Sequence, residues 1–149
     1  MNKKSEELKI TFRIDICKIL SFSAIYNEEL EKKNYISDYT FEISINQEID
    51  KSKKTVSYKS DVKIYLDPKK EIFLGYISTL NVFTILNFED IVKVNDKDRN
   101  FGLPLPVAST LLSLSFSNTR GMLVAKSEGT SMQKVILPIL NPVKFLTGV

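Results

Sequence analysis

The residue types that most often carry chemistry are scarce in this sequence. Its 149 residues include no histidine and a single cysteine, Cys17. Without histidine, neither the Ser-His and Cys-His nucleophile pairs nor the usual zinc sites can be assembled. The five glycines are scattered, and none forms the spaced pair that a phosphate-binding loop places before its lysine. The sequence therefore predicts no metal site, no cofactor and no nucleotide-binding loop.

Carboxylates remain as candidates for general acid and base chemistry, but they lie in polar segments. Glu28, Glu29 and Glu31 stand in a run of charged residues, and Asp90 lies in a connecting segment. Side chains in such segments are most often solvated surface charges. We therefore predict no catalytic residue and expect that the protein is not an enzyme.

A basic turn leaves one binding function open. Lys51, Lys53 and Lys54 lie close together, and Tyr58 follows them. Lysines beside an aromatic ring can bind single-stranded nucleic acid, although a solvated hairpin turn is the commoner origin of such a cluster. The net charge of +3, from 21 Lys and Arg against 18 Asp and Glu, is too small to imply nucleic acid by itself. A small RNA-binding or scaffold protein stays open as an alternative.

Length and composition are those of one globular domain over residues 1–149, in which the polar residues 1–8 are expected to be flexible. Cys17 has no partner for an intrachain disulfide and is expected to be structural, either buried or at a sheet edge. The N-terminus lacks the apolar run of a secretory signal, and no window approaches the roughly 20 apolar residues that span a bilayer. We expect a cytoplasmic protein that is not inserted in a membrane.

Four segments carry the alternating pattern of half-buried strands. They cover residues 10–24, 41–45, 56–66 and 71–86, and a bulge is expected at Ile19 and Leu20. Their connections are too short for crossover helices, so the strands are predicted to pair as a four-stranded antiparallel sheet. The fourth segment is apolar on both parities, which predicts cover on both faces. Residues 88–94 fit a short helical turn.

A long helix is predicted after Pro104 and Pro106, ending at the Arg120-Gly121 pair, with an extended apolar tail beyond. Apolar residues recur along it at spacings of three and four, and the remaining positions are nearly all Ser or Thr rather than Lys or Glu. Such an exposed face suits close packing against a second helix. We therefore predict an oligomer interface on this helix, with Val107, Leu111, Leu114 and Ser115 as candidate contacts.

Several short motifs, taken in order, resemble the SecB family of export chaperones. Leu20-Ser21-Phe22-Ser23-Ala24 is similar to the family's Ile-Ser-Phe-Glu-Ala, and Val82-Phe83-Thr84-Ile85 to its Ile-Phe-Ser-Ile. Pro106-Val107-Ala108 and Arg120-Gly121 resemble the entry and exit of the family's helix. Residues 140–145, LNPVKF, are similar to its Leu-x-Pro-Val-x-Phe. The motifs are short, but their order and spacing extend the resemblance over about residues 10 to 146.

The resemblance implies an α+β, SecB-like fold: a four-stranded antiparallel sheet, one long helix and an extended C-terminal segment. It also implies a homotetramer, a dimer of dimers, whose apolar grooves hold unfolded polypeptides without ATP. On the segments that carry the resemblance, the large apolar side chains are the candidate client-binding residues. These are Phe22, Tyr76, Phe83, Phe88 and Leu103.

Two departures from the family pattern bear on the client. The positions that align with the family's acidic contacts to the SecA motor hold Ile19, Ser23 and Tyr76, and the chain reaches Val149 soon after the proline motif. The motor-binding surface, the second helix and the motor-binding tail are therefore expected to be missing or vestigial. We predict a holdase for a dedicated, aggregation-prone client such as an antitoxin. A general export chaperone that delivers preproteins to SecA is the alternative within the same family.

Overall fold

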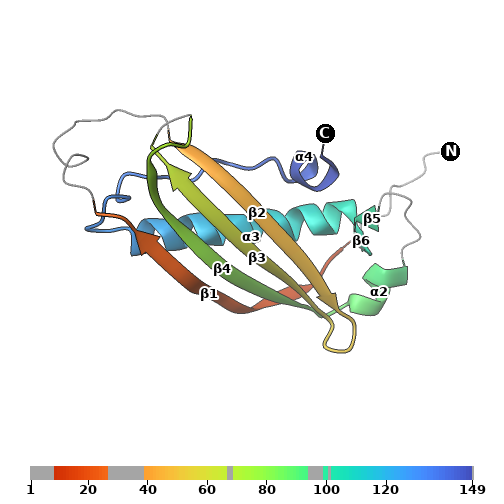
Figure 1. Cartoon of the computed structure of the whole chain (residues 1–149). Helices are drawn as coiled ribbons and strands as arrows, with labels where there is room; N and C mark the ends of the chain where they lie inside the picture. The colour runs from red at the N-terminus through yellow and green to blue at the C-terminus, as the bar shows by residue number, and fades with distance from the viewer. Residues whose placement is uncertain (1–8, 27–38, 67–68, 94–98, 101, 149) are drawn as a thin grey trace.

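A computed structural model describes residues 9–26, 39–66, 69–93, 99–100 and 102–148. Within these ranges the chain forms a four-stranded sheet and, on one of its faces, a layer of helices (Figure 1). Residues 1–8, which were expected to be flexible, and the candidate carboxylates Glu28, Glu29 and Glu31 lie outside the described residues.

The sheet is antiparallel throughout, as the strand pattern predicts. Its strands are β1 (Phe12–Ala24), β2 (Thr40–Asp50), β3 (Thr55–Tyr65) and β4 (Phe73–Ile85). Their order across the sheet is β1-β4-β3-β2, so β1 pairs with β4 and β2 forms the opposite edge. The strands at both edges therefore each leave one side of their backbone without a partner strand in the described sheet.

Irregularities are concentrated in β1, whereas β2 and β3 pair without interruption. The pairing of β1 with β4 shifts register between Ile14 and Ile16 and again between Ile19 and Ser21. The second shift confirms the predicted bulge. β2 and β3 stay in register from the Thr40–Tyr65 pair to the turn at residues 51–54.

The helical layer begins after β4. It consists of α2 (Phe88–Lys93), the two-residue strands β5 (Arg99–Asn100) and β6 (Leu103–Pro104), the long helix α3 (Leu105–Lys126) and the short helix α4 (Pro142–Thr147). The predicted helix end at Gly121 is wrong. The helix continues because Leu123 is buried against the sheet, and the Ser127 amide donates to the Leu123 carbonyl at 2.9 Å where the helix stops.

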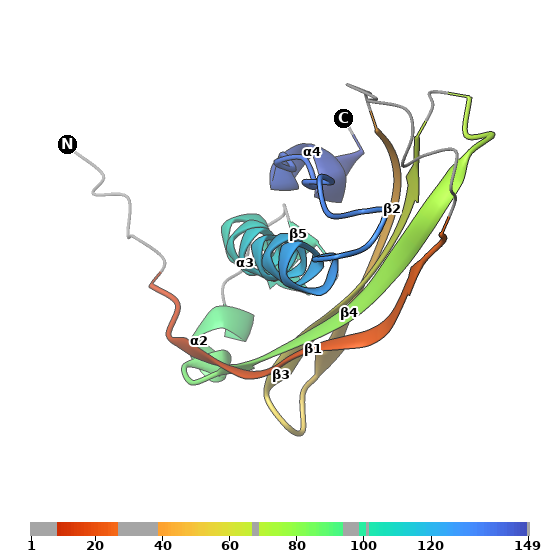
Figure 2. The ribbon, with the colours of Figure 1, turned by 90° about the vertical axis from the view of Figure 1, so that its left-hand side faces the viewer.

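In the part of the chain that the structure describes, helices cover the concave face of the curved sheet and none covers the other face, as Figure 2 shows. The prediction that β4 is covered on both faces is therefore wrong. Leu80 and Val82 point to the uncovered face and are nevertheless half-buried. β4 is an inner strand, so side chains of β1 and β3 on either side shield these two residues.

The core consists of two apolar clusters. The first core cluster contains Val56, Tyr58, Phe83, Ile85, Phe88, Ile91, Leu103, Val107, Ala108, Leu111 and Leu112. The second core cluster contains Val62, Ile64, Leu66, Leu74, Ile77, Phe116, Leu123, Met132, Val135 and Leu137. α3 spans both, so its N-terminal half packs on the first cluster and its C-terminal half on the second.

Candidate functional site

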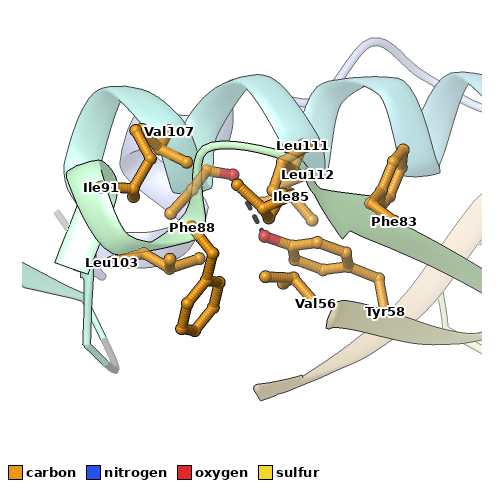
Figure 3. Packing of buried hydrophobic residues seen from close by; sticks show 11 residues of the cluster. Val56, Tyr58, Phe83, Ile85, Phe88, Ile91, Leu103, Val107, Leu111 and Leu112 are labelled. Carbon is orange, nitrogen blue, oxygen red and sulfur yellow. Dashed lines mark hydrogen bonds between the residues drawn. The ribbon is translucent and has the colours of Figure 1, made fainter. Parts of the chain in front are cut away.

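The predicted client-binding residues do not form one surface. Phe83, Phe88 and Leu103 are buried in the first core cluster, where Figure 3 shows them beneath α3. Phe22 is half-buried on the concave face, and Tyr76 is 37% exposed. Their role as client contacts stays a prediction, and the burial of three of them gives those three a core role within this chain.

The predicted interface residues lie mostly on the inward face of α3. Val107, Leu111 and Ser115 are buried, and Leu114 is half-buried. Up to Val124, the exposed positions of the helix hold small or uncharged side chains instead: Pro106, Thr110, Ser113, Ser117, Gly121 and Val124. This is the Ser- and Thr-rich face that the sequence predicts for close packing against another helix.

A row of apolar side chains on β2 is only partly covered. Phe41, Ile43, Ile45 and Ile49, here called the β2 row, alternate along the strand and are each half-buried, whereas their partners on β3 are fully buried. α3 contacts β1, β3 and β4, and β2 is the edge strand beyond them. The β2 row is therefore an apolar part of the sheet that α3 covers incompletely.

The C-terminal segment lies against the same region. Residues 135–148, here called the strap, run alongside α3 and end in α4 (Figures 1 and 2). Leu140 packs on the second core cluster, as Ile43 and Ile45 do, and Leu146 packs on the first, as Ile49 and Leu114 do. The strap, the β2 row and Leu114 therefore pack on the same two core clusters.

Exposed apolar residues gather in two further places. Ile14, Ile16 and Leu20 are exposed on the edge strand β1, and Cys17 is exposed beside them, at a sheet edge as predicted. Val124 of α3 and Ile136, Ile139 and Val143 of the strap are exposed as well. Edge strands and apolar patches of this kind are common contact sites for other chains.

Charged groups pair with one another on the uncovered face of the sheet. Glu42 lies 3.2 Å from the Lys70 ammonium and 3.8 Å from that of Lys63, and the hydrogen bond from Lys70 is the largest cause of its lowered pKa. The Asp15 carboxylate bonds the Thr84 hydroxyl and the Arg13 guanidinium, which together lower its pKa. Exposed pairs of this kind are satisfied surface charges rather than a reactive site.

The aromatic residue that was predicted to lie beside the basic turn, Tyr58, does not reach the surface there. Lys51, Lys53 and Lys54 are exposed, and the Lys54 ammonium lies 3.8 Å from the Glu89 carboxylate. Tyr58 points into the core and is fully buried there, so it offers no ring for a base to stack on. Among the residues described, no group of three or more His, Cys, Asp or Glu could hold a metal ion, and Asp90 is exposed.

The chain thus combines a four-stranded antiparallel sheet with one long helix on the concave face of that sheet. Models of known protein families and curated proteins give no match to the sequence. Among solved structures, the chain is similar to the Mycobacterium tuberculosis Rv1957 SecB-like chaperone, solved in complex with a ChAD peptide from the Rv1956 HigA1 antitoxin. The TM-score is 0.54 at 11% identity, over 87% of this chain and 88% of that one. The predicted SecB-like fold is thereby confirmed.

No helix in the described part of the chain is long and apolar enough to cross a membrane.

Proposed function

We propose that this protein is an ATP-independent holdase that binds unfolded or aggregation-prone polypeptides in the cytoplasm. The observation that carries the proposal is the β2 row, an alternating apolar row at the edge of the sheet that α3 leaves half-covered. The fold it shares with a SecB-like chaperone supports the same function.

The geometry suits an extended client. A client segment with apolar residues at every second position can place them over the β2 row, because strand residues alternate with the same period. Its backbone can pair with the free edge of β2, as in recognition by strand addition. Each contact is weak and many act together, so the client is held without a nucleotide and released when it folds.

A dedicated client such as an antitoxin is the more specific form of this proposal. Support comes from the Rv1957 structure, whose bound peptide derives from an antitoxin. Delivery to SecA is the alternative, but the residues aligned with the motor contacts carry no charge. Ile19 is half-buried, and Ser23 is the register partner of Tyr76. Binding of purified SecA would favour the export role.

The assembly we propose is a homo-oligomer, a dimer of dimers. The uncharged, small-residue face of α3 and the exposed apolar residues of edge strand β1 support it, because both are suited to pairing with a second copy. Light scattering should give the mass of a tetramer. Ser117→Arg, on the exposed face of α3, should lower that mass, and a monomeric wild type would contradict the assembly.

Aggregation of a reduced, unfolded model protein tests the function directly. The wild type should suppress light scattering at near-stoichiometric ratios. Ile43→Asn should weaken client binding about tenfold, because one apolar contact contributes roughly 1–3 kcal/mol. Ser44→Asn, the next residue on the same strand but exposed on the opposite face, is the matched control. Circular dichroism checks that both variants fold, and Ile43→Ala gives a milder change in the same direction.

The proposal fails if the folded wild type neither suppresses aggregation nor retains any polypeptide when it is expressed with the products of neighbouring genes. Salt-dependent binding of oligonucleotides with no effect on aggregation would instead support the RNA-binding alternative.

A further inference from the structure

The strap binds to its own chain in the way an extended peptide binds to a surface. Val135 and Leu137 are buried in the second core cluster, whereas Ile136 and Ile139 are 67% and 88% exposed. No strand in the described part of the sheet pairs with residues 135–140. The segment is therefore held by alternate side chains rather than by a backbone ladder.

One arginine anchors the middle of the strap. Arg120 of α3 donates from Nε to the Leu137 carbonyl at 3.1 Å and from Nη2 to the Pro138 carbonyl at 2.9 Å. Up to this point the strap also has two fully buried side chains. The guanidinium thus marks the boundary between a tightly packed part and the residues that follow.

Residues 139–148 are packed more loosely. Leu140 and Leu146 are half-buried, and α4 has no buried residue. Several backbone hydrogen bonds at this end are local: the Lys144 and Phe145 amides donate to Asn141, and the Gly148 amide donates to Lys144. A helix of six residues is far below the length that is stable alone in water, so its order depends on its contacts with the rest of the fold, those of Leu140 and Leu146 among them.

We propose that residues 139–148 occupy part of the client site in the empty protein and are displaced when a client binds. The inference rests on the holdase function proposed above. Leu140 shares the second core cluster with Ile43 and Ile45, and Leu146 shares the first with Ile49 and Leu114. The displaced segment therefore lies against the same clusters as the β2 row, and Arg120 limits the opening to the residues beyond Pro138.

The chemistry of the segment matches that of the client that displaces it. Residues 139–148 carry one charged side chain, Lys144, which is exposed, and otherwise offer apolar or small uncharged groups. An unfolded client with apolar side chains at alternate positions supplies equivalent contacts. Because the internal segment is already tethered, only clients with several such contacts can compete with it, which protects the β2 row from weak, single contacts.

Hydrogen exchange on the full-length protein tests the displacement. The probe is the reduced, unfolded model client of the aggregation assay. Saturating client should accelerate exchange of the Lys144, Phe145 and Gly148 amides at least several-fold, while core amides of β4 stay protected. Unchanged or slower exchange at these three amides, under conditions where the client is bound, would overturn the inference.

A variant pair gives an independent readout. Leu146→Ser removes a contact of the segment with the first core cluster and should tighten client binding several-fold, whereas Ile139→Ser, at a fully outward position, should leave it unchanged. Weaker binding by Ile139→Ser with no gain from Leu146→Ser would show that the segment itself holds clients, and would overturn the inference. If the wild type binds no client at all, the holdase function and this inference both fail.

Discussion

The hydroxyls of Thr79 on β4 and Thr119 on α3 lie 2.7 Å apart and share a hydrogen bond, and both residues are fully buried. They belong to a polar layer that separates the two core clusters. Beside them, the Asn118 amide donates to the Asn81 side-chain oxygen at 2.9 Å. Directional bonds of this kind fix how far along the sheet α3 lies, because a shift of one helical turn would leave buried groups unpaired.

A double-mutant cycle should detect this pairing. Thr119→Val leaves the buried Thr79 hydroxyl without its partner and should cost about 1–3 kcal/mol of unfolding free energy. Thr79→Val together with Thr119→Val replaces both hydroxyls by methyl groups and should recover part of that loss. Urea unfolding of the four proteins gives the coupling energy. Costs that simply add would mean that the two hydroxyls contribute independently.

Strand positions could be predicted from the sequence, but their order could not. Alternation of apolar residues is a local signal, and it located all four strands, although β2 continues to Asp50, five residues beyond its predicted end. The pairing of β1 with β4 joins residues such as Phe12 and Ile85, which no local pattern connects. The helix end at Gly121 was missed because the burial of Leu123 outweighs the helix propensity of one glycine.

The candidate site was harder to predict, because it too depends on the strand order and on burial, which local patterns do not show. Phe83, Phe88 and Leu103 were chosen because they are large and apolar, which are also the properties of core residues. Ile43 on β2 and Val62 on β3 are register partners with the same alternating pattern, yet one is half-buried and the other fully buried. Only the strand order, which makes β2 an edge, separates them. The β2 row was recognised as a strand but not as a site.

Gly75 on β4 is predicted to tolerate no side chain. A Cβ at this position would lie 2.1 Å from the Ser23 carbonyl oxygen and 3.0 Å from the end of the Met132 side chain. The carbonyl belongs to the paired strand β1, so the backbone of one strand must move, and Gly75→Ala should cost about 3 kcal/mol or more.

Gly121→Ala is the control for this substitution, measured in the same thermal and urea unfolding experiments. Apart from the adjoining residues and backbone of α3 itself, no atom lies within 4 Å of a Cβ at Gly121, so alanine should stabilise the fold by about 0.5–1 kcal/mol. Equal effects of the two substitutions would contradict the close approach of β1 and β4 at Gly75.

Asp50 should make the turn between β2 and β3 sensitive to acid. Its carboxylate accepts hydrogen bonds from the Ser52 hydroxyl at 2.6 Å and from the Ser52 and Lys53 amides at 3.0 Å. The bond from the Ser52 hydroxyl is the largest cause of its lowered pKa. Because the ionised form is favoured in the folded state, this stability is present above the ordinary pKa of 3.8 and is lost as pH falls through the folded pKa.

Asp50→Ala should therefore be less stable than the wild type at pH 7, and the difference should shrink in acid. Asp50→Asn keeps one side-chain oxygen acceptor and should fall between the two. An NMR titration of the wild type should place the pKa of Asp50 below 3.8. A stability difference that does not change with pH would show that the charge of Asp50 contributes nothing to the turn.

Tyr58 links the fully buried part of the sheet to the β2 edge. Its hydroxyl donates to the Gln47 side-chain oxygen at 2.8 Å, and its ring meets that of Phe83 edge-on at 6.1 Å between centroids. Tyr58→Phe keeps the ring but leaves Gln47 without this donor, and should cost about 1 kcal/mol at neutral pH.

Burial raises the pKa of Tyr58 above its ordinary value of 10.0, so the contribution of the Tyr58 hydroxyl to stability is present below pH 10.0 and declines as pH rises beyond it. The stability difference between wild type and Tyr58→Phe should therefore narrow in alkali and then reverse, because phenylalanine has no proton to lose. Denaturant unfolding from pH 7 upward measures this, with Tyr76→Phe, whose ring is 37% exposed, as the control. A gap between Tyr58→Phe and the wild type that stays constant into strong alkali would contradict the burial of the Tyr58 hydroxyl.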